Sequence, residues 1–271
     1  MIGDPGERRS SGIASELAVA VGFLTVVPVP ERFWSGKVSF GRSFSWFPLV
    51  GLLVGGLLSG VALALLTVLP VQVVAALLVA LWVSLTGGLH LDGLMDSCDG
   101  LFCAKPPGER LEVMRDSRVG AFGVLGAVCV LLVKFAALSV LLAVEGGVSF
   151  VFALIAAPVL GRWAMTFAVV AFPYYRHGET LGESFTREAG VPQLALASGL
   201  TGAVIIGLGT YADGLSVVVA VLVSLIAVCC LAWFAVAKLG GLTGDVYGMI
   251  CEVVEVAALV AFTAFVGAGG A

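Results

Sequence analysis

The sequence predicts an all-α protein, a polytopic transmembrane helical bundle. Three observations point to this class. Of the 271 residues, 60% are hydrophobic and 12% are charged, the mean hydropathy is +1.11, and the apolar residues form runs of about 20, the length at which a helix crosses a bilayer. A soluble globule of this composition would expose a large apolar surface. We therefore expect a lipid bilayer around a single integral-membrane domain, residues 1–271.

Seven apolar runs predict about seven spanning helices. They cover residues 46–69, 71–91, 119–144, 148–172, 194–210, 215–236 and 249–266. Pro70 and the short stretches 145–147 and 212–214 separate three consecutive pairs, which predicts three tight hairpins. The patterns GLLVG from Gly51 and GLLSG from Gly56 predict close helix packing.

The N-terminal part of the chain is different. Residues 1–12 are polar and Gly-rich, so we expect a flexible segment. The apolar stretch 13–29 has no small-residue cleavage site after it, which argues against a cleaved signal. It is short for a span and carries Glu16, so an interfacial helix competes with a true crossing.

Positive charge predicts the topology. Lys and Arg occur in the connections 31–45, 98–118 and 173–193 and at Lys238, whereas the three hairpin turns have none. By the positive-inside rule the charged connections face the cytoplasm. The net charge of −4 gives no reason to expect a nucleic-acid partner. The six cysteines include no C-x-x-C pair, and we interpret them as unpaired thiols.

The most informative stretch is GGLHLDGLMDSCDGLF, residues 87–102, at the end of the second apolar run. On one helix, Asp92, Asp96 and Asp99 would lie within an arc of about 60°. Three carboxylates held this close repel one another, so a cation is expected to neutralise them. Hard oxygen ligands favour Mg²⁺ or Mn²⁺. Magnesium held by few carboxylates usually also binds substrate phosphate, so the motif indicates phosphoryl or pyrophosphoryl chemistry.

This block and MRDSRVGAFG from Met114 closely resemble the cobalamin synthase family, the adenosylcobinamide-GDP ribazoletransferases. Further matching segments span nearly the whole chain in the expected order: FLTVVPVP near the N-terminus, GRSFSWFPLVG from Gly41, GR at Gly161, PYYRHGETLGESF from Pro173 and GGLTGDVYG from Gly240. Met95, Ser97 and Cys98 stand where the family usually has small residues such as Ala and Thr. None of the three is an expected ligand.

The resemblance implies a Mg²⁺-dependent enzyme of the cytoplasmic (inner) membrane of a prokaryote, with its active site facing the cytoplasm. It implies that α-ribazole, or its 5′-phosphate, attacks adenosylcobinamide-GDP, giving adenosylcobalamin or its 5′-phosphate and releasing GMP. We predict that Asp92, Asp96 and Asp99 hold Mg²⁺ against the pyrophosphate. One of them, with Asp99 favoured, would also act as the base.

Other residues are candidates for substrate contacts. Arg118 could hold a phosphate, and Asp116 could orient it or join the metal shell. Alternatively, Arg118 could simply anchor the span that follows. Asp245 and Glu252, seven residues apart, would share a helix face and join the metal or nucleoside site; the alternative for Asp245 is a helix-start role. The remaining candidates are His90, Arg42, Ser43, Arg176, His177 and Glu183. A packed interfacial histidine and ordinary solvated loops are their alternatives.

Lys134 and Arg162 fall inside apolar runs, where an unpaired charge is costly. A structural ion pair and a direct substrate role both remain open for them. The sequence also leaves open the nucleobase of the lower ligand and whether the chain forms a homo-oligomer.

Two rival functions differ in testable features. A CDP-alcohol phosphotransferase would carry D-G-x-x-A-R, but Asp92-Gly93 is followed by Leu94, Met95, Asp96 and Ser97. A cation transporter would be expected to place its acids at mid-span, on broken helices.

Overall fold

The computed structural model describes residues 12–30, 33, 40–144, 149–175, 188–209 and 214–265. The described elements are α1 (Ile13–Leu24), α2 (Phe40–Ser43), η2 (Phe44–Trp46), α3 (Phe47–Leu65), α4 (Val71–Leu85), α5 (Leu89–Phe102), α6 (Pro107–Met114), α7 (Ala121–Leu142), α8 (Ser149–Ala171), α10 (Val191–Gly209), α11 (Gly214–Leu239) and α12 (Gly244–Thr263). Within these ranges no strand forms, and Tyr174 and Leu242 pair in an isolated bridge. The predicted all-α class is confirmed.

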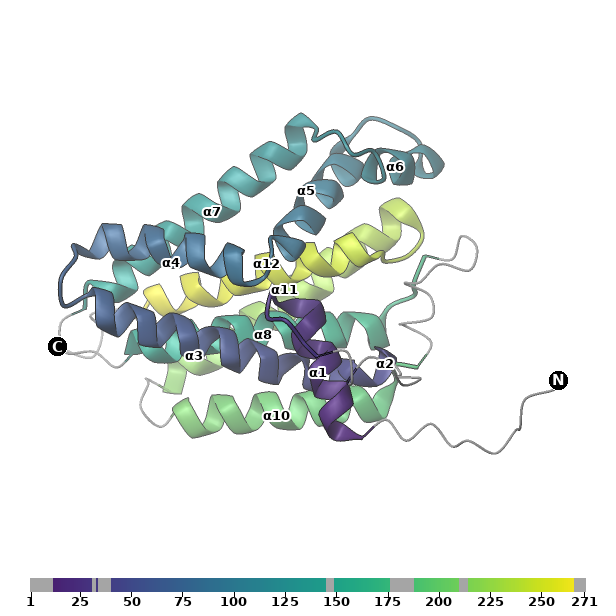
Figure 1. The fold of residues 1–271 in the computed structure, drawn as a ribbon. Helices are drawn as coiled ribbons and strands as arrows, with labels where there is room; N and C mark the ends of the chain where they lie inside the picture. Colours follow the sequence, from purple (N-terminus) through teal and green to yellow (C-terminus); the bar gives the residue numbers. More distant parts are fainter. Residues whose placement is uncertain are drawn as a thin grey trace.

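The helices form an elongated bundle (Figure 1). Among the described residues, six helices are long and apolar enough to span a membrane, and the count becomes seven if α4 and α5 form one broken span. In the apolar windows of α8 and α12, 83% and 72% of residues are buried, against 17–44% in the other candidate spans. Helices α8 and α12 therefore form the centre. The outer helices expose large apolar side chains such as Leu132, Ile206 and Trp233, as expected next to lipid.

Close packing explains the first of the two predicted small-residue patterns. A Cβ on Gly51 would meet the backbone of Pro158, and one on Gly55 would meet the backbone of Leu154, so α3 approaches α8 closely at these glycines. Gly56 and Gly60 meet nothing within 4 Å of a built Cβ. Only the GLLVG half of the prediction is confirmed.

Residues 71–91, predicted as one apolar span, do not form one continuous helix. Helix α4 ends at Leu85, and α5 leaves it at 87°. Gly87 and Gly88 have φ of 60° and 72°, a left-handed conformation that glycine adopts without steric cost. The Gly88 N–H donates to the Val83 carbonyl at 2.9 Å, which closes the end of α4. The acidic motif is thereby placed on a helix of its own.

Helix α1 favours the interfacial interpretation. Its 12 residues extend about 18 Å, too short for a hydrocarbon core of about 30 Å. The Trp46 indole N–H donates to Glu16 at 3.1 Å, which ties α1 to η2. The predicted flexible segment, residues 1–12, lies outside the described residues except for Gly12. Two of the three predicted hairpin turns also lie outside them. All six cysteines are free thiols, as predicted.

Candidate active site

Asp92, Asp96 and Asp99 all lie on α5, as predicted, but they do not share one environment. Asp92 is exposed in the first turn, Asp96 is half-buried and Asp99 is buried. The sequence placed them at the C-terminal end of a span; because α5 starts at Leu89, Asp92 instead lies near a helix N-terminus, where the helix dipole stabilises negative charge.

Asp245 joins these residues through a close helix crossing. A Cβ on Gly93 would lie 2.8 Å from the Asp245 carbonyl oxygen, and one on Gly248 would lie 3.1 Å from the His90 carbonyl oxygen. These two glycines let α5 and the start of α12 meet. The crossing brings Asp245 to the part of α5 that carries Asp92 and Asp96. We call Asp92, Asp96 and Asp245 the acidic cluster.

Asp99 is engaged elsewhere. Its two carboxylate oxygens accept hydrogen bonds from the backbone N–H groups of Gly120 and Gly123, both at 2.8 Å. It therefore caps the N-terminus of α7 from a neighbouring helix. A Cβ on Gly120 or Gly123 would collide with this carboxylate, which explains both glycines of RVGAFG. The structure fixes α5 against α7 through Asp99.

The donor set of the acidic cluster fits Mg²⁺. In the described part of the chain, no group of three or more His, Cys, Asp or Glu side chains is close enough to hold a metal ion by itself. Magnesium does not require such a group, because it commonly binds one or two carboxylates and takes its other ligands from water and substrate phosphates. Asp92 also borders a pocket of about 390 Å³ beside the α4–α5 break, which leaves room for such ligands.

Asp116 and Arg118 lie together in a second pocket, of about 630 Å³, which Asp99 also lines. The Arg118 guanidinium donates to Asp116 at 2.6 Å. This hydrogen bond lowers the pKa of Asp116 to about 2. The two side chains pair with each other, and Arg118 is exposed enough to meet an anion.

Two other candidates belong to a buried ion network inside the bundle. Lys134 Nζ donates to Glu252 at 2.8 Å and to Glu255 at 2.7 Å, and Arg162 also pairs with Glu255. His90 Nδ1 lies 3.4 Å from Arg162. We use the name buried ion network for these five residues. Glu252 and His90 are thus engaged in the buried ion network, and structural pairing accounts for Lys134 and Arg162.

The last candidates are not brought to α5 by the described residues. Ser43 is buried and donates to the Phe40 carbonyl at 2.6 Å. Arg42 is exposed on α2, which packs against α1. The other three, Arg176, His177 and Glu183, lie outside the described residues.

Comparison with known proteins identifies the family. The model of the family described as cobalamin-5-phosphate synthase matches residues 16–263. The chain belongs to this family. It is 40% identical to an adenosylcobinamide-GDP ribazoletransferase of Thermosynechococcus vestitus, over 90% of this chain and 94% of the relative. It is 36% identical to the protein of that name in Desulforamulus reducens, over 89% and 93%. No solved structure matches.

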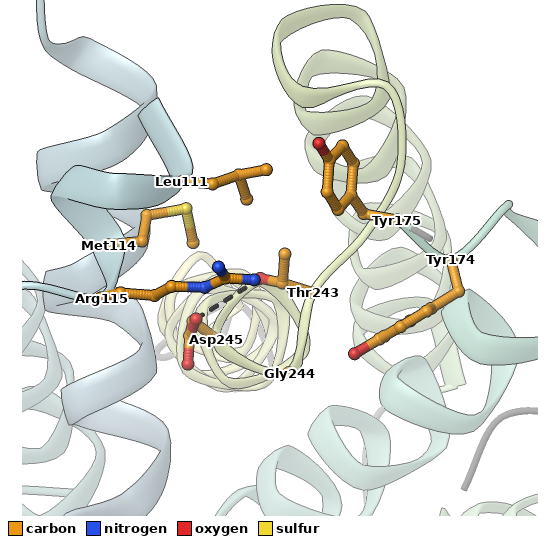
Figure 2. A pocket seen from close by; sticks show the side chains of 8 residues that line it. All are labelled: Leu111, Met114, Arg115, Tyr174, Tyr175, Thr243, Gly244 and Asp245. Atoms are coloured by element: carbon orange, nitrogen blue, oxygen red, sulfur yellow. Dashed lines mark hydrogen bonds between the residues drawn. The ribbon is translucent and has the colours of Figure 1, made fainter. Parts of the chain in front are cut away.

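The part of the chain that matches the cobalamin-5-phosphate synthase family contains the whole acidic cluster and features that sequence reasoning missed. One is Glu255, which follows Glu252 by three residues in the same apolar run and could have been paired with Lys134 or Arg162 by charge counting. Others line a pocket next to Asp245 that contains Arg115, Tyr174, Tyr175 and Thr243 (Figure 2). Their signal was present in MRDSR, PYYR and GGLTGD, but no chemistry singled them out.

Proposed function

We propose that this protein is an adenosylcobinamide-GDP ribazoletransferase that uses Mg²⁺. A hydroxyl of α-ribazole, or of its 5′-phosphate, attacks the phosphorus that carries cobinamide. The new P–O bond joins the nucleoside to adenosylcobinamide phosphate, and the P–O bond to GMP breaks, with the electron pair leaving on GMP. The hydroxyl proton passes to a carboxylate. The acidic cluster beside a close α5–α12 crossing, in a chain of this family, carries the proposal.

Bound Mg²⁺ would offset the negative charge that develops on the pyrophosphate oxygens in the transition state. Asp92 and Asp96 are the proposed ligands, with Asp245 as the third carboxylate. Because both Asp99 oxygens accept backbone hydrogen bonds, we assign Asp99 mainly to positioning α5 and transfer the proposed base role to the acidic cluster. Arg118, paired with Asp116, would bind a phosphate on the other side of Asp99.

We infer that the protein lies in the inner membrane and that its active site faces the cytoplasm. The charged connections predicted to be cytoplasmic include the α5–α7 region, and Figure 1 shows α6 at the opposite end of the bundle from the α3–α4 turn. The described turn at 66–70 contains no Lys or Arg. This asymmetry supports the orientation through the positive-inside rule.

A broken span was one feature expected of a cation transporter, and the α4–α5 break provides one. The other expectation, acids at mid-span, is met by Glu252 and Glu255, but Lys134 and Arg162 neutralise them. Among the described residues, the mid-span acids Glu252 and Glu255 are therefore not available to bind a transported cation, and the enzyme is favoured.

The decisive experiment is to incubate the purified protein with adenosylcobinamide-GDP, α-ribazole and Mg²⁺ and to measure GMP and the complete cobamide. Asp92→Asn and Asp96→Asn should each lower kcat by at least about 100-fold, the scale on which one transition-state contact acts, without loss of folded protein. A fully active Asp96→Asn enzyme would contradict the metal role. Product formed from CDP-diacylglycerol and an alcohol would instead support the rival phosphotransferase.

A further inference from the structure

The pocket in Figure 2 has a volume of about 150 Å³ and lies next to Asp245. We call it the tyrosine pocket. Three segments build it: the end of α6, the residues that follow α8, and the start of α12. Its lining residues are Leu111, Met114, Arg115, Tyr174, Tyr175, Thr243, Gly244 and Asp245. Figure 2 shows the tyrosines entering from one side and the α6 residues from the other, with Thr243 and Asp245 between them.

Backbone contacts hold the tyrosine wall in place. The Tyr175 N–H donates to the Leu242 carbonyl, and the Leu242 N–H donates to the Pro173 carbonyl, both at 2.8 Å. A Cβ on Gly241 would lie 2.6 Å from the Tyr175 nitrogen, so only glycine lets the two strands of backbone approach this closely. The tyrosine wall is therefore fixed to the segment that leads into Asp245.

The α6 wall is fixed to the helix that carries the other acids. Arg110 donates from Nη1 to the Gly100 carbonyl at 3.0 Å and to the Leu101 carbonyl at 2.7 Å, at the end of α5. Met114 packs directly over Gly100, where a Cβ would collide with it. Both walls are thus tied to elements of the acidic cluster, and the pocket exists before any ligand binds.

The lining divides into two chemical halves. Leu111 and Met114 are buried apolar side chains, and the two tyrosines add aromatic surface. Arg115, Thr243 and Asp245 supply a cation, a hydroxyl and a carboxylate. A cavity of about 150 Å³ accommodates one benzene-sized ring. Planar bases stack on aromatic side chains. The pocket therefore suits one planar aromatic ring that carries a polar sugar.

The carboxylate of Asp245 indicates which part of the substrates binds in the tyrosine pocket. A carboxylate accepts hydrogen bonds from ribose hydroxyls directly, whereas it can face a diphosphate only through a bridging cation. Asp245 meets α5 at Gly93, next to Asp92, so a hydroxyl held by Asp245 lies beside the other two acids of the cluster. Arg115 is exposed and lines the same pocket as Asp245. It can hold a phosphate at the rim of the pocket, away from the apolar half.

We propose that the tyrosine pocket binds the attacking nucleoside: the base between the tyrosines and the buried apolar side chains, the ribose against Asp245, and a 5′-phosphate, where present, on Arg115. This inference rests on the proposed function and adds the acceptor subsite to it. The anionic donor, adenosylcobinamide-GDP, then binds next to Asp92 and Asp96.

Steady-state kinetics with both substrates varied tests the tyrosines. Tyr174→Leu and Tyr175→Leu should raise the KM for α-ribazole by about 10-fold, the order of effect expected when a base loses an aromatic stacking partner. The KM for adenosylcobinamide-GDP should change less than about 2-fold. Tyr174→Phe and Tyr175→Phe, which keep the rings, should retain the wild-type KM. Trp233→Leu, on the exposed face of α11, is the control.

Arg115→Gln tests the phosphate. It should raise the KM for α-ribazole 5′-phosphate and leave that for free α-ribazole unchanged. Equilibrium dialysis with α-ribazole alone, without donor, gives a readout independent of turnover: the Leu variants should lose binding and the Phe variants should keep it.

The outcomes separate the two proposals. If the wild-type protein releases no GMP from adenosylcobinamide-GDP, the proposed function fails. If the wild type is active but the tyrosine variants keep the α-ribazole KM, or raise only the donor KM, the acceptor subsite is wrong. A Leu variant that does not fold leaves the Phe and Arg115 variants to decide: a loss of acceptor binding with Tyr→Phe, or equal effects of Arg115→Gln on both acceptors, would overturn the assignment.

Discussion

The buried ion network allows a quantitative test of how charge is tolerated within the bundle. Lys134, Glu252 and Glu255 are at most 3% exposed, and Arg162 is fully buried, so two cations face two anions out of water. Lys134→Met removes one cation and leaves the carboxylates with an excess charge. Breaking a buried pair in this way costs about 3–5 kcal/mol. We expect a loss near the middle of that range, because Lys134 makes two of the short contacts.

The matched control restores the balance. In the double variant Lys134→Met with Glu252→Met, Arg162 and Glu255 remain as a neutral pair, and apolar side chains replace the removed groups. Such replacement of a buried pair is often neutral. Lys134 also lies 4.3 Å from the centre of the Trp82 ring. The double variant does not recover this cation–π contact, so a deficit of about 1–2 kcal/mol should remain.

The assay is unfolding of the purified protein in mixed detergent micelles with increasing SDS, followed by circular dichroism. Lys134→Met alone and Glu252→Met alone should each unfold at clearly lower SDS fractions than the wild type. The double variant should recover most of the difference. Additive losses would refute the reasoning, because residues that share one charge network must couple. A single variant as stable as the wild type would also refute it.

Three further predictions concern the site. Asp99→Asn should destabilise the protein by about 1.5–3 kcal/mol, since the charged acceptor for two α7 N–H groups is lost. Thermal unfolding measures the loss. An unchanged unfolding transition would contradict the role of Asp99 in fixing α5 against α7. Gly93→Ala should lower kcat more than stability, because its Cβ would displace the Asp245 backbone; GMP release with parallel melting curves tests this, and wild-type kcat would refute it. Chelation with EDTA should abolish turnover, Mg²⁺ or Mn²⁺ should restore it, and activity that survives chelation would refute metal dependence.

The membrane part of the fold was predictable because the bilayer imposes one requirement on every span, a long apolar run. The α4–α5 break was not. The residues through Leu91 continue the apolar run, and only the left-handed conformation of Gly87 and Gly88 ends the helix. Local composition does not distinguish a glycine pair within a helix from one that ends it.

Contacts between residues far apart in the chain were the other feature that the sequence did not predict. The sequence supplied the acids of the site, but the partner of Asp99 is 21 residues away, and Lys134 reaches carboxylates 118 and 121 residues away. A periodic pattern defines which face of a helix a residue occupies. It contains no information on which other helix meets that face, so both the cap on α7 and the pairing of Lys134 required the structure.

The contrast between the two groups of acids on α12 argues for the function of the first. Glu252 and Glu255 are matched by two cations in the interior. Asp245, at the start of the same helix, has two further carboxylates beside it, and in the described part of the chain no short ion pair neutralises the three. Packing alone gives no reason to concentrate unpaired acids where α5 and α12 cross. In the function we propose, a cation that arrives with a diphosphate substrate would supply the missing charge, and the acidic cluster would be a site completed by its ligands.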